Sequence, residues 1–342
     1  MSAEASPNMP VVSPYAVGDQ SRGIARIKFA ILTPTYHRSD TYLPFCIETL
    51  RRQTKEYNGT EVEYEHIIIN NDPDDEAASD YIFDEAASDP RITPVIAPAS
   101  NGECAALNLG FSVAVENMLG RRLAGETLPS FIVPVADDDG LCSNALASYT
   151  RALQEDPSLE FIFGKAAFID EHDQPTDETY GIDYNNVHYS DEIANFHGQM
   201  LRCNEVPRSA AIGVLALARV GLWEPQFRLP DWQIYVKLLH LRVRYRMLNE
   251  TTDYYRMHPG QLGLEERLNG VWEKDGVRLS AEYPGLLDEN YLPARPTTSL
   301  EYANAQTSGH GSVREYNVRP GHGCPLVLPA ADPAYQKSTP AA

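Results

Sequence analysis

Apolar strand patterns alternate with helical patterns four times between residues 26 and 155, and this alternation limits the fold more than any other feature. The expected strands are the short apolar runs at 26–33, 63–70, 91–97 and 130–136. The helical patterns that follow them lie at 41–54, 76–87, 101–118 and 143–154. Strands that alternate with helices are typical of a parallel sheet covered by helices. The sequence therefore predicts an α/β fold with a Rossmann-like, mostly parallel sheet.

Later in the chain these patterns are less regular. We expect strands at 159–163, 166–169, 243–248 and 251–257, and helices at 209–220 and 231–241. Residues 170–206 are polar and lack a period, and a loop of this length inside a domain is usually functional or disordered. Beyond residue 287 the composition turns to Pro, Gly, Ser and Thr, which predicts an extended tail. Asp40 and Ser143 are the predicted N-caps of the helices that follow them.

The fourth expected strand runs directly into three aspartates. An apolar stretch from Phe131 to Ala136 is followed by Asp137, Asp138 and Asp139. Adjacent carboxylates repel one another, so they are stable either in water or around a cation. Open α/β sheets bind their ligands at the carboxyl ends of the strands. We therefore predict a divalent metal site at this strand end, with a solvated acidic turn as the alternative.

The charge of the chain restricts its partners. There are 48 acidic and 28 basic residues, which gives a formal net charge of −20. Such a surface repels polyanions, so we expect no nucleic acid partner and no anionic membrane partner. A small anionic ligand stays compatible with this charge, because a bound cation or a few arginines can reverse the local sign.

The cysteines and the apolar segments indicate a cytoplasmic protein. The five cysteines are scattered and form no C-x-x-C pair, which favours reduced thiols. No run approaches the roughly 20 apolar residues of a membrane span. Residues 1–25 read as a flexible segment, because they lack the basic start and apolar core of a secretory signal.

Several common motifs are absent from the sequence, and four polar groups remain. There is no G-x-G-x-x-G after the first strand, no G-x-x-x-x-G-K-[ST] loop and no G-x-S-x-G elbow. The remaining groups are Thr33–Arg38, Asn70–Asp72, Asp137–Asp139, and the pair formed by Pro230–Trp232 and Arg256–Gln261. Each alone is compatible with a turn or a helix cap, so their order along the chain carries the information.

In that order the groups resemble the motifs of family 2 glycosyltransferases with the GT-A fold, over residues 27–262. Thr33–Arg38 resembles their P-T-Y-N-R opening, with His37 in place of Asn. The aspartate run is similar to their D-x-D region. The other matches are Asn101-Gly102 with Asn108-Leu109-Gly110 for the two N-x-G patterns, Gly221-Leu222-Trp223 with Pro230-Asp231-Trp232 for G-x-F…E-D-W, and His258-Pro259-Gly260-Gln261 for the late histidine motif.

Two positions depart from the family pattern. Asn70 or Asn71 stands where the family usually carries an acid beside the nucleobase. Pro230 replaces the usual Glu, which leaves Asp231 as the only carboxylate of that motif.

The resemblance implies a metal-dependent inverting glycosyltransferase that uses Mg²⁺ or Mn²⁺. It would move a sugar from a nucleoside diphosphate sugar, a UDP- or GDP-sugar, to a hydroxyl of a glycan or small-molecule acceptor. It assigns the general base to Asp231 and the metal to Asp137, Asp139 and His258. The donor-binding residues that it assigns are Thr33, Pro34, Thr35, Tyr36, Arg38, Asn71, Asp72, Asn108, Asp137 and Asp138.

The resemblance also divides the chain into three parts. Residues 26–262 would form the GT-A domain, with a nucleotide-sugar half at 26–142 and an acceptor half at 143–262. Residues 1–25 would precede it, and a C-terminal helix and extended tail would occupy 263–342. The sequence leaves open whether the protein forms a homo-oligomer.

Two other classes of function stay open from the sequence. A nucleotidyltransferase would carry a Gly-rich basic loop after its first strand, where this chain has Thr35-Tyr36-His37-Arg38. A non-catalytic module would bind a nucleotide sugar without transferring it.

Overall fold

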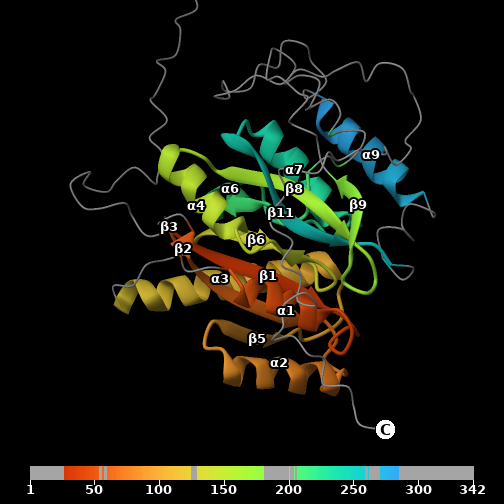
Figure 1. The fold of residues 1–342 in the computed structure, drawn as a ribbon. Helices are drawn as coiled ribbons and strands as arrows, with labels where there is room; N and C mark the ends of the chain where they lie inside the picture. Colours follow the sequence, from red (N-terminus) through yellow and green to blue (C-terminus); the bar gives the residue numbers. More distant parts are fainter. Residues whose placement is uncertain are drawn as a thin grey trace, which may run out of the picture.

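The protein is described by a computed structural model that covers residues 27–53, 56–57, 60–124, 129–180, 200, 204, 206–258, 261 and 270–284. These residues form a nine-stranded mixed sheet with helices packed on both faces (Figure 1). The predicted N-terminal segment, most of the predicted 170–206 loop and the predicted tail lie outside the described residues. The α/β prediction is confirmed.

The first half of the chain builds the parallel part of the sheet, in the order β5-β4-β1-β6. Its elements are β1 (Lys28–Thr35), α1 (Leu43–Arg51), β4 (Glu63–Asn70), α2 (Glu76–Ser88), β5 (Ile92–Ile96), α3 (Glu103–Ala124) and β6 (Pro129–Pro134). A small separate hairpin is formed by β2 (Glu56–Tyr57) and β3 (Thr60–Glu61). Because Thr35 pairs with Asn70 in a parallel register, β1 and β4 end side by side.

The second half extends the sheet in the order β6-β10-β8-β11-β7 and mixes strand directions. Its elements are β7 (Gly140–Leu141), α4 (Ala145–Glu155), β8 (Phe161–Ile169), β9 (Pro175–Tyr180), β10 (Ala211–Gly213), α6 (Val214–Arg219), α7 (Pro230–His240), β11 (Tyr245–Arg256) and α9 (Val271–Glu282). β10 is antiparallel to both of its neighbours, whereas β8 and β11 are parallel. Pairing of Tyr254 with Gly140 brings the end of β11 next to the three aspartates that follow β6, Asp137–Asp139, here called the acidic run.

The core lies in two layers, one on each face of the sheet. In β1, Ala30 and Leu32 face the layer that includes α3, α6 and α7, whereas Phe29 and Ile31 face the layer that includes α1, α2 and α4. Successive side chains of a strand point to opposite faces, so a strand covered on both sides is mostly apolar. β1 therefore reads as a nearly continuous apolar run, whereas β4 also buries the polar Glu65 and His66.

Three local predictions from the sequence are wrong. The N-caps of α1 and α4 are Tyr42 and Asn144, without side-chain cap bonds, rather than Asp40 and Ser143. The predicted helix at 209–220 begins as strand β10, because Ile212 pairs with both β6 and β8 inside the sheet. The paired strands expected on either side of residues 164–165 and 249–250 are the single strands β8 and β11.

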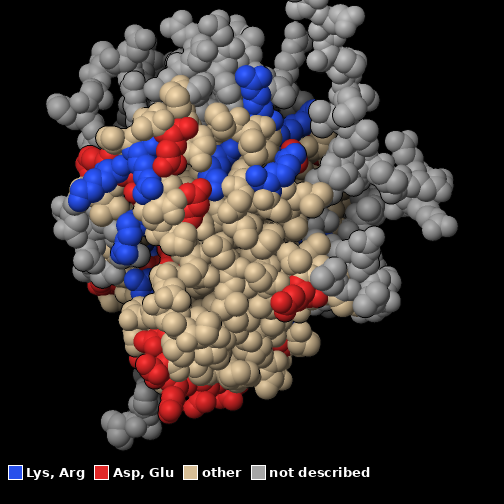
Figure 2. Space-filling view, turned by 180° about the vertical axis from the view of Figure 1, so that it is seen from behind, with Lys and Arg blue, Asp and Glu red and all other residues tan. Residues whose placement is uncertain are grey.

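Side-chain charge is distributed unevenly over the rear face of the molecule. Figure 2 shows acidic side chains at the lower end of this face, where α2 lies, and lysine and arginine side chains over its upper half. The local sign of the charge therefore differs from that of the whole chain. None of the helices in the described ranges has the length and the apolar content needed to cross a membrane.

Gly164 lets β8 and β11 approach each other, and this contact gives a first prediction. A Cβ at residue 164 would lie 2.5 Å from the backbone oxygen of Glu250, which cannot rotate away. We expect Gly164→Ala to lower the free energy of unfolding by about 1–3 kcal/mol, as overpacking does. Chemical denaturation measures this change.

Gly120→Ala is the matched control, because a Cβ on that exposed residue of α3 meets nothing within 4 Å. There we expect a gain of about 0.5–1 kcal/mol from helix propensity. Equal stability of Gly164→Ala and the unmodified protein would contradict the close approach of β8 and β11.

Candidate functional site

The candidate site lies where three parallel strands end at the same edge of the sheet. Thr35 pairs with Asn70, and the backbone N–H of Val135 donates to the Leu32 carbonyl at 2.9 Å. The turn after β1, the polar turn after β4 and the acidic run after β6 therefore share one edge. This is the edge at which open α/β sheets bind their ligands.

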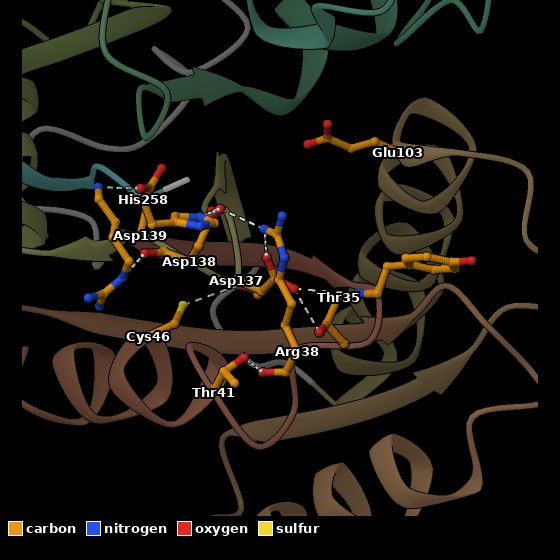
Figure 3. Close-up of polar contacts among 12 residues, drawn as sticks. Thr35, Arg38, Thr41, Cys46, Glu103, Asp137, Asp138, Asp139 and His258 are labelled. Carbon is orange, nitrogen blue, oxygen red and sulfur yellow. Dashed lines mark hydrogen bonds and ion pairs between the residues drawn. The ribbon is translucent and has the colours of Figure 1, made fainter. Parts of the chain in front are cut away.

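Asp137 ties the acidic run to the turn after β1. Its Oδ2 accepts hydrogen bonds from the Thr35 hydroxyl at 2.8 Å and from the Tyr36 backbone N–H at 3.4 Å. Its Oδ1 accepts from Arg38 Nη1 at 3.1 Å (Figure 3). Burial raises the pKa of the Asp137 carboxyl, and the adjacent negative charge of Asp138 raises it further.

Asp138 is the carboxylate that Arg38 and His258 both contact. Its Oδ2 accepts from Arg38 Nη1 at 2.6 Å and lies 3.1 Å from Nε2 of His258. The His258 ring in turn packs against the Tyr42 ring, with their centroids 4.5 Å apart. Burial alone would raise the pKa of Asp138, but the hydrogen bond from His258 and the charge of Arg38 outweigh it and lower the pKa.

Asp139 faces the end of β11 instead of Arg38. Its Oδ1 accepts from the Arg256 backbone N–H at 2.9 Å. Burial and the negative charge of Asp138 raise the pKa of Asp139 well above its ordinary value. Full ionisation of the three neighbouring acids is therefore costly unless a cation joins them.

Arg256 is a fully buried guanidinium to which the sequence assigned no role. Its Nε donates to the Asp138 carbonyl at 2.8 Å, and its Nη1 donates to the Asp170 carbonyl at 2.9 Å. Nη1 also pairs with Asp173 at 2.6 Å. The guanidinium lies 4.6 Å from the centroid of the Phe45 ring. Arg256 therefore connects the acidic run to the turn between β8 and β9.

The polar turn after β4 has one unused acceptor and is bridged to the turn after β1 by His37. Within the described residues, Asn71 Oδ1 is buried without a hydrogen-bond partner. His37 lies 2.9 Å from Asp72 through Nε2 and 3.2 Å from Asp75 through Nδ1. The φ angle of His37 is 54°, in the left-handed region that Asn also tolerates. This conformation agrees with the Asn that the resembled motif carries at that place.

Three of the predicted donor residues serve the fold. Thr33 and Pro34 lie within β1, and the Thr33 hydroxyl bonds to Nε2 of the buried His66 at 2.9 Å. The amide of Asn108 bonds to the Trp223 backbone in both directions, at 2.8 and 3.1 Å. Thr35, Tyr36 and Arg38, in contrast, are brought to the acidic run.

Asp231 lies in the first turn of α7, one residue after Pro230. Its Oδ2 accepts from Asn204 Nδ2 at 2.8 Å. Burial raises the pKa of Asp231, and the positive charge of Arg208 opposes this effect. Burial also raises the pKa of Tyr255, and the charges of Asp138, Asp139 and Asp231 all add to it. The Tyr255 hydroxyl therefore lies within electrostatic reach of both the acidic run and Asp231.

The structure also places charged residues at the site that the sequence analysis did not single out. Glu103 is the first residue of α3 and forms an ion pair with Arg208. Figure 3 shows its side chain extending from α3 toward the side on which the Arg38 guanidinium lies. The position of Glu103 directly after the Asn101-Gly102 motif was the one sequence signal that could have identified it.

The acidic run fits a hard cation in the type of its donors, but not as a complete ligand set. Among the described residues, no three His, Cys, Asp or Glu side chains are grouped so that they could hold a metal ion. The predicted ligands do not share one point, because Asp139 faces the Arg256 backbone and His258 contacts Asp138. However, Asp137 Oδ1 and Asp138 Oδ2 converge on one cationic atom, Arg38 Nη1. Carboxylate oxygens are the ligands that Mg²⁺ and Mn²⁺ prefer.

Comparison with protein families confirms the resemblance seen in the sequence. Residues 30–146, from β1 to the start of α4, match the family described as Glycosyl transferase family 2. No curated protein matches the chain.

Comparison with solved structures gives the fold. The structures of S. aureus TarS residues 1–349, alone and in complex with UDP-GlcNAc, align with TM-scores of 0.51 and 0.54 at 13% identity. These alignments cover 77% of this chain and 70% and 71% of the TarS chains. The mannosyltransferase PcManGT from Pyrobaculum calidifontis, in complex with GDP-Man and Mn²⁺, aligns with a TM-score of 0.49 at 13% identity over 77% of this chain and 73% of its own. The chain therefore has the GT-A fold of these structures, and residues 30–146 are similar to the glycosyltransferase family named above.

The buried contacts of Arg256 predict that the loss of this side chain destabilises the protein. Arg256→Met leaves Asp173 and the Asp138 carbonyl without their cationic partner. We expect the free energy of unfolding to fall by about 3–5 kcal/mol, as it does when one member of a buried pair is removed. Thermal and denaturant unfolding measure this loss.

The control is Arg219→Met, which breaks the ion pair between the exposed Arg219 and Glu160. It should change stability by less than about 1 kcal/mol. Similar losses in the two variants would show that Arg256 has no special role in holding the acidic run.

Proposed function

We propose that this protein is a metal-dependent, inverting glycosyltransferase that transfers a sugar from a nucleoside diphosphate sugar to an acceptor hydroxyl. The observation that carries the proposal is the convergence of Asp137 and Asp138 on one cationic position at the carboxyl edge of the sheet. Asp231 approaches the same region from the start of α7, with Tyr255 within electrostatic reach of both. The site therefore offers both a place for the leaving group and a separate carboxylate for the acceptor.

A UDP- or GDP-sugar is the proposed donor. The similar TarS structure holds UDP-GlcNAc, and the turn after β4 offers Asn71 Oδ1, a buried acceptor without a described hydrogen-bond partner. Burying such an oxygen costs about 1–3 kcal/mol unless a ligand or water satisfies it. An N–H of a nucleobase at this edge would do so.

Asp138 and Asp137 are the proposed holders of Mg²⁺ or Mn²⁺, with His258 beside Asp138. Bound there, such an ion would supply positive charge against the negative charge of the departing diphosphate. The two carboxylate oxygens already approach one cation, so their geometry suits this task. Arg38 holds that position now, and its guanidinium is well suited to donate to phosphate oxygens at the same edge.

Asp231 is the proposed general base. A base that removes the acceptor proton works best with a pKa near the working pH, and burial raises the pKa of Asp231 in that direction. Asn204 holds the carboxylate in place through Oδ2. One base on the face opposite the leaving group gives inversion at the anomeric carbon.

The described free cysteines Cys46, Cys104 and Cys142 are buried thiols, which supports a reducing, cytoplasmic location.

Asp231→Asn tests the base. We expect it to reduce transfer by about 100-fold to 10,000-fold, the usual contribution of a general base, while donor binding is kept. Sugar release from UDP-GlcNAc and a donor panel, with Mn²⁺ present, measures the rate, and calorimetry with UDP measures binding. Asp80→Asn, at an exposed position of α2, is the matched control. Near-normal turnover in Asp231→Asn would remove this residue from the mechanism.

Asp138→Asn tests the metal. In the unmodified protein we expect chelation of Mn²⁺ to weaken UDP binding at least tenfold, about 1.4 kcal/mol. In Asp138→Asn, binding should be weak with and without EDTA, because the oxygen shared by Arg38 and His258 has lost its charge. Calorimetry measures both affinities, and Asp84→Asn on the exposed side of α2 is the control. If EDTA weakened UDP binding as strongly in Asp138→Asn as in the unmodified protein, the assignment of the metal to Asp138 would be contradicted.

A further inference from the structure

A short segment before β10 is fixed in place by three buried side chains. The Tyr235 hydroxyl donates to the carbonyls of Pro207 and Arg208, at 3.1 and 2.5 Å. The bonds at the next residue are Tyr149 hydroxyl to Ser209 carbonyl at 2.8 Å and Ser209 N–H to Asp253 Oδ2 at 3.2 Å. A backbone held at consecutive residues leaves little freedom in where the Arg208 side chain begins.

The same segment contacts α7 on the helix face that carries Asp231. Tyr235, which holds the Arg208 carbonyl, lies four residues after Asp231 on α7 and so shares its helix face. Asn204, slightly earlier in the segment, donates to Asp231 at 2.8 Å. Arg208 is close enough to Asp231 for each charge to shift the pKa of the other group.

Arg208 also reaches the opposite half of the molecule. Its Nη2 forms an ion pair with Glu103, which begins α3 directly after the Asn101-Gly102 turn. The guanidinium thus contacts a carboxylate of the first half of the chain and acts electrostatically on Asp231 of the second half. Both side chains of the pair are about one-fifth exposed, at 21% and 22%, so solvent screens them only partly.

The other titratable groups near Asp231 come from three elements. They are Cys104 on α3, Tyr235 on α7 and Tyr255 on β11, and each has its pKa raised by burial and, in addition, by the charge of Asp231. Their neutral forms therefore prevail near neutral pH. Arg38 acts on Arg208 by repulsion from the turn after β1. Asp275 and Arg228 act on Cys104, and Arg208, which is paired with Glu103, is the cation that acts on Asp231.

We propose that Arg208 is a positioning residue of the transfer reaction, whose charge is shared between Glu103 and Asp231 and thereby sets the proton affinity of Asp231. This inference rests on the proposed role of Asp231 as the base. A cation near a carboxylate favours its ionised form, and a second carboxylate weakens that effect. Arg208→Gln should raise the pKa of Asp231, whereas Glu103→Gln should lower it. Arg208→Lys should stay near the original value, because it retains the charge.

The first experiment reads Asp231 directly, without an acceptor and without turnover. The carboxyl carbons of aspartate are labelled with ¹³C, and the Asp231 signal is identified by its loss in Asp231→Asn. We expect the midpoint of the Asp231 titration to rise by about one pH unit or more in Arg208→Gln and to fall in Glu103→Gln. Midpoints that agree within the error of the titration would overturn the proposal. Arg219→Gln, which acts on the distant Glu160 pair, is the control.

The second experiment separates this inference from the proposed function. The rate of sugar release from UDP-GlcNAc with Mn²⁺ is measured against pH for the same variants, and UDP affinity and thermal unfolding are measured beside it. The acid limb of the pH–rate profile should move by the same amount and in the same direction as the midpoint of the Asp231 titration. A moved midpoint with a fixed limb would overturn Asp231 as the base and with it the role of Arg208 in the reaction. Lower melting temperatures with unmoved midpoints would show a purely structural role and overturn the inference alone.

Discussion

Two arginines from distant parts of the chain keep the acidic run inside the protein. Arg256, at the end of β11, bonds to the Asp138 carbonyl through its side chain and to the Asp139 carboxylate through its backbone. Arg38, after β1, places Nη1 between Asp137 and Asp138. Removing charged groups from water costs several kcal/mol for each ion unless cations and donors compensate. The edge of the sheet can hold three adjacent aspartates because both arginines are present.

The order of the strands brings these two arginines to the acidic run. β1 and β6 are neighbours and parallel, so the turn that carries Arg38 and the acidic run leave the sheet together. β11 lies at the other end of the sheet order and reaches the run through its antiparallel pairing with β7. The site is therefore made by contacts between residues about 100 positions apart, and its geometry follows from the topology.

The sequence predicted the elements of the first half well because their pattern is local. The strand predicted at 63–70 is β4 with the same bounds, because its apolar stretch Ile67–Ile69 marks a strand buried inside the sheet, although Glu65 and His66 are buried there as well. The second half is less predictable for the same reason. β10 has only three residues, and its conformation is decided by pairing with β6 and β8, which no period in the sequence records. Likewise, Gly164 looked like a break between strands but marks the place where β11 passes close to β8.

The site divides in a similar way between local and tertiary information. Asp137, Asp138, Arg38 and His258 could be found from their motifs, and the structure brings them together. Thr33 and Asn108 belong to the same motifs but bond to His66 and Trp223, because a motif also records what the fold requires.

Arg208 and Asn204 fall within or beside a polar stretch without a period. Their partners Glu103 and Asp231 lie on two separate helices, α3 and α7. Such pairing exists only in the folded protein, so no local pattern predicts it.

The arrangement also places positive charge where the proposed anionic donor would bind, although the chain as a whole is strongly acidic. Arg38 and Arg208 repel each other, and each is held by carboxylates from a different part of the fold. A diphosphate at this edge of the sheet would lie near the Arg38 guanidinium, which contacts Asp137 and Asp138 there. Because guanidinium groups bind phosphate oxygens through charge-assisted hydrogen bonds, the local sign of the charge matters more here than the formal charge of −20. In the proposed function, attraction of the donor would depend on Arg38, and the proton affinity of Asp231 would depend on Arg208.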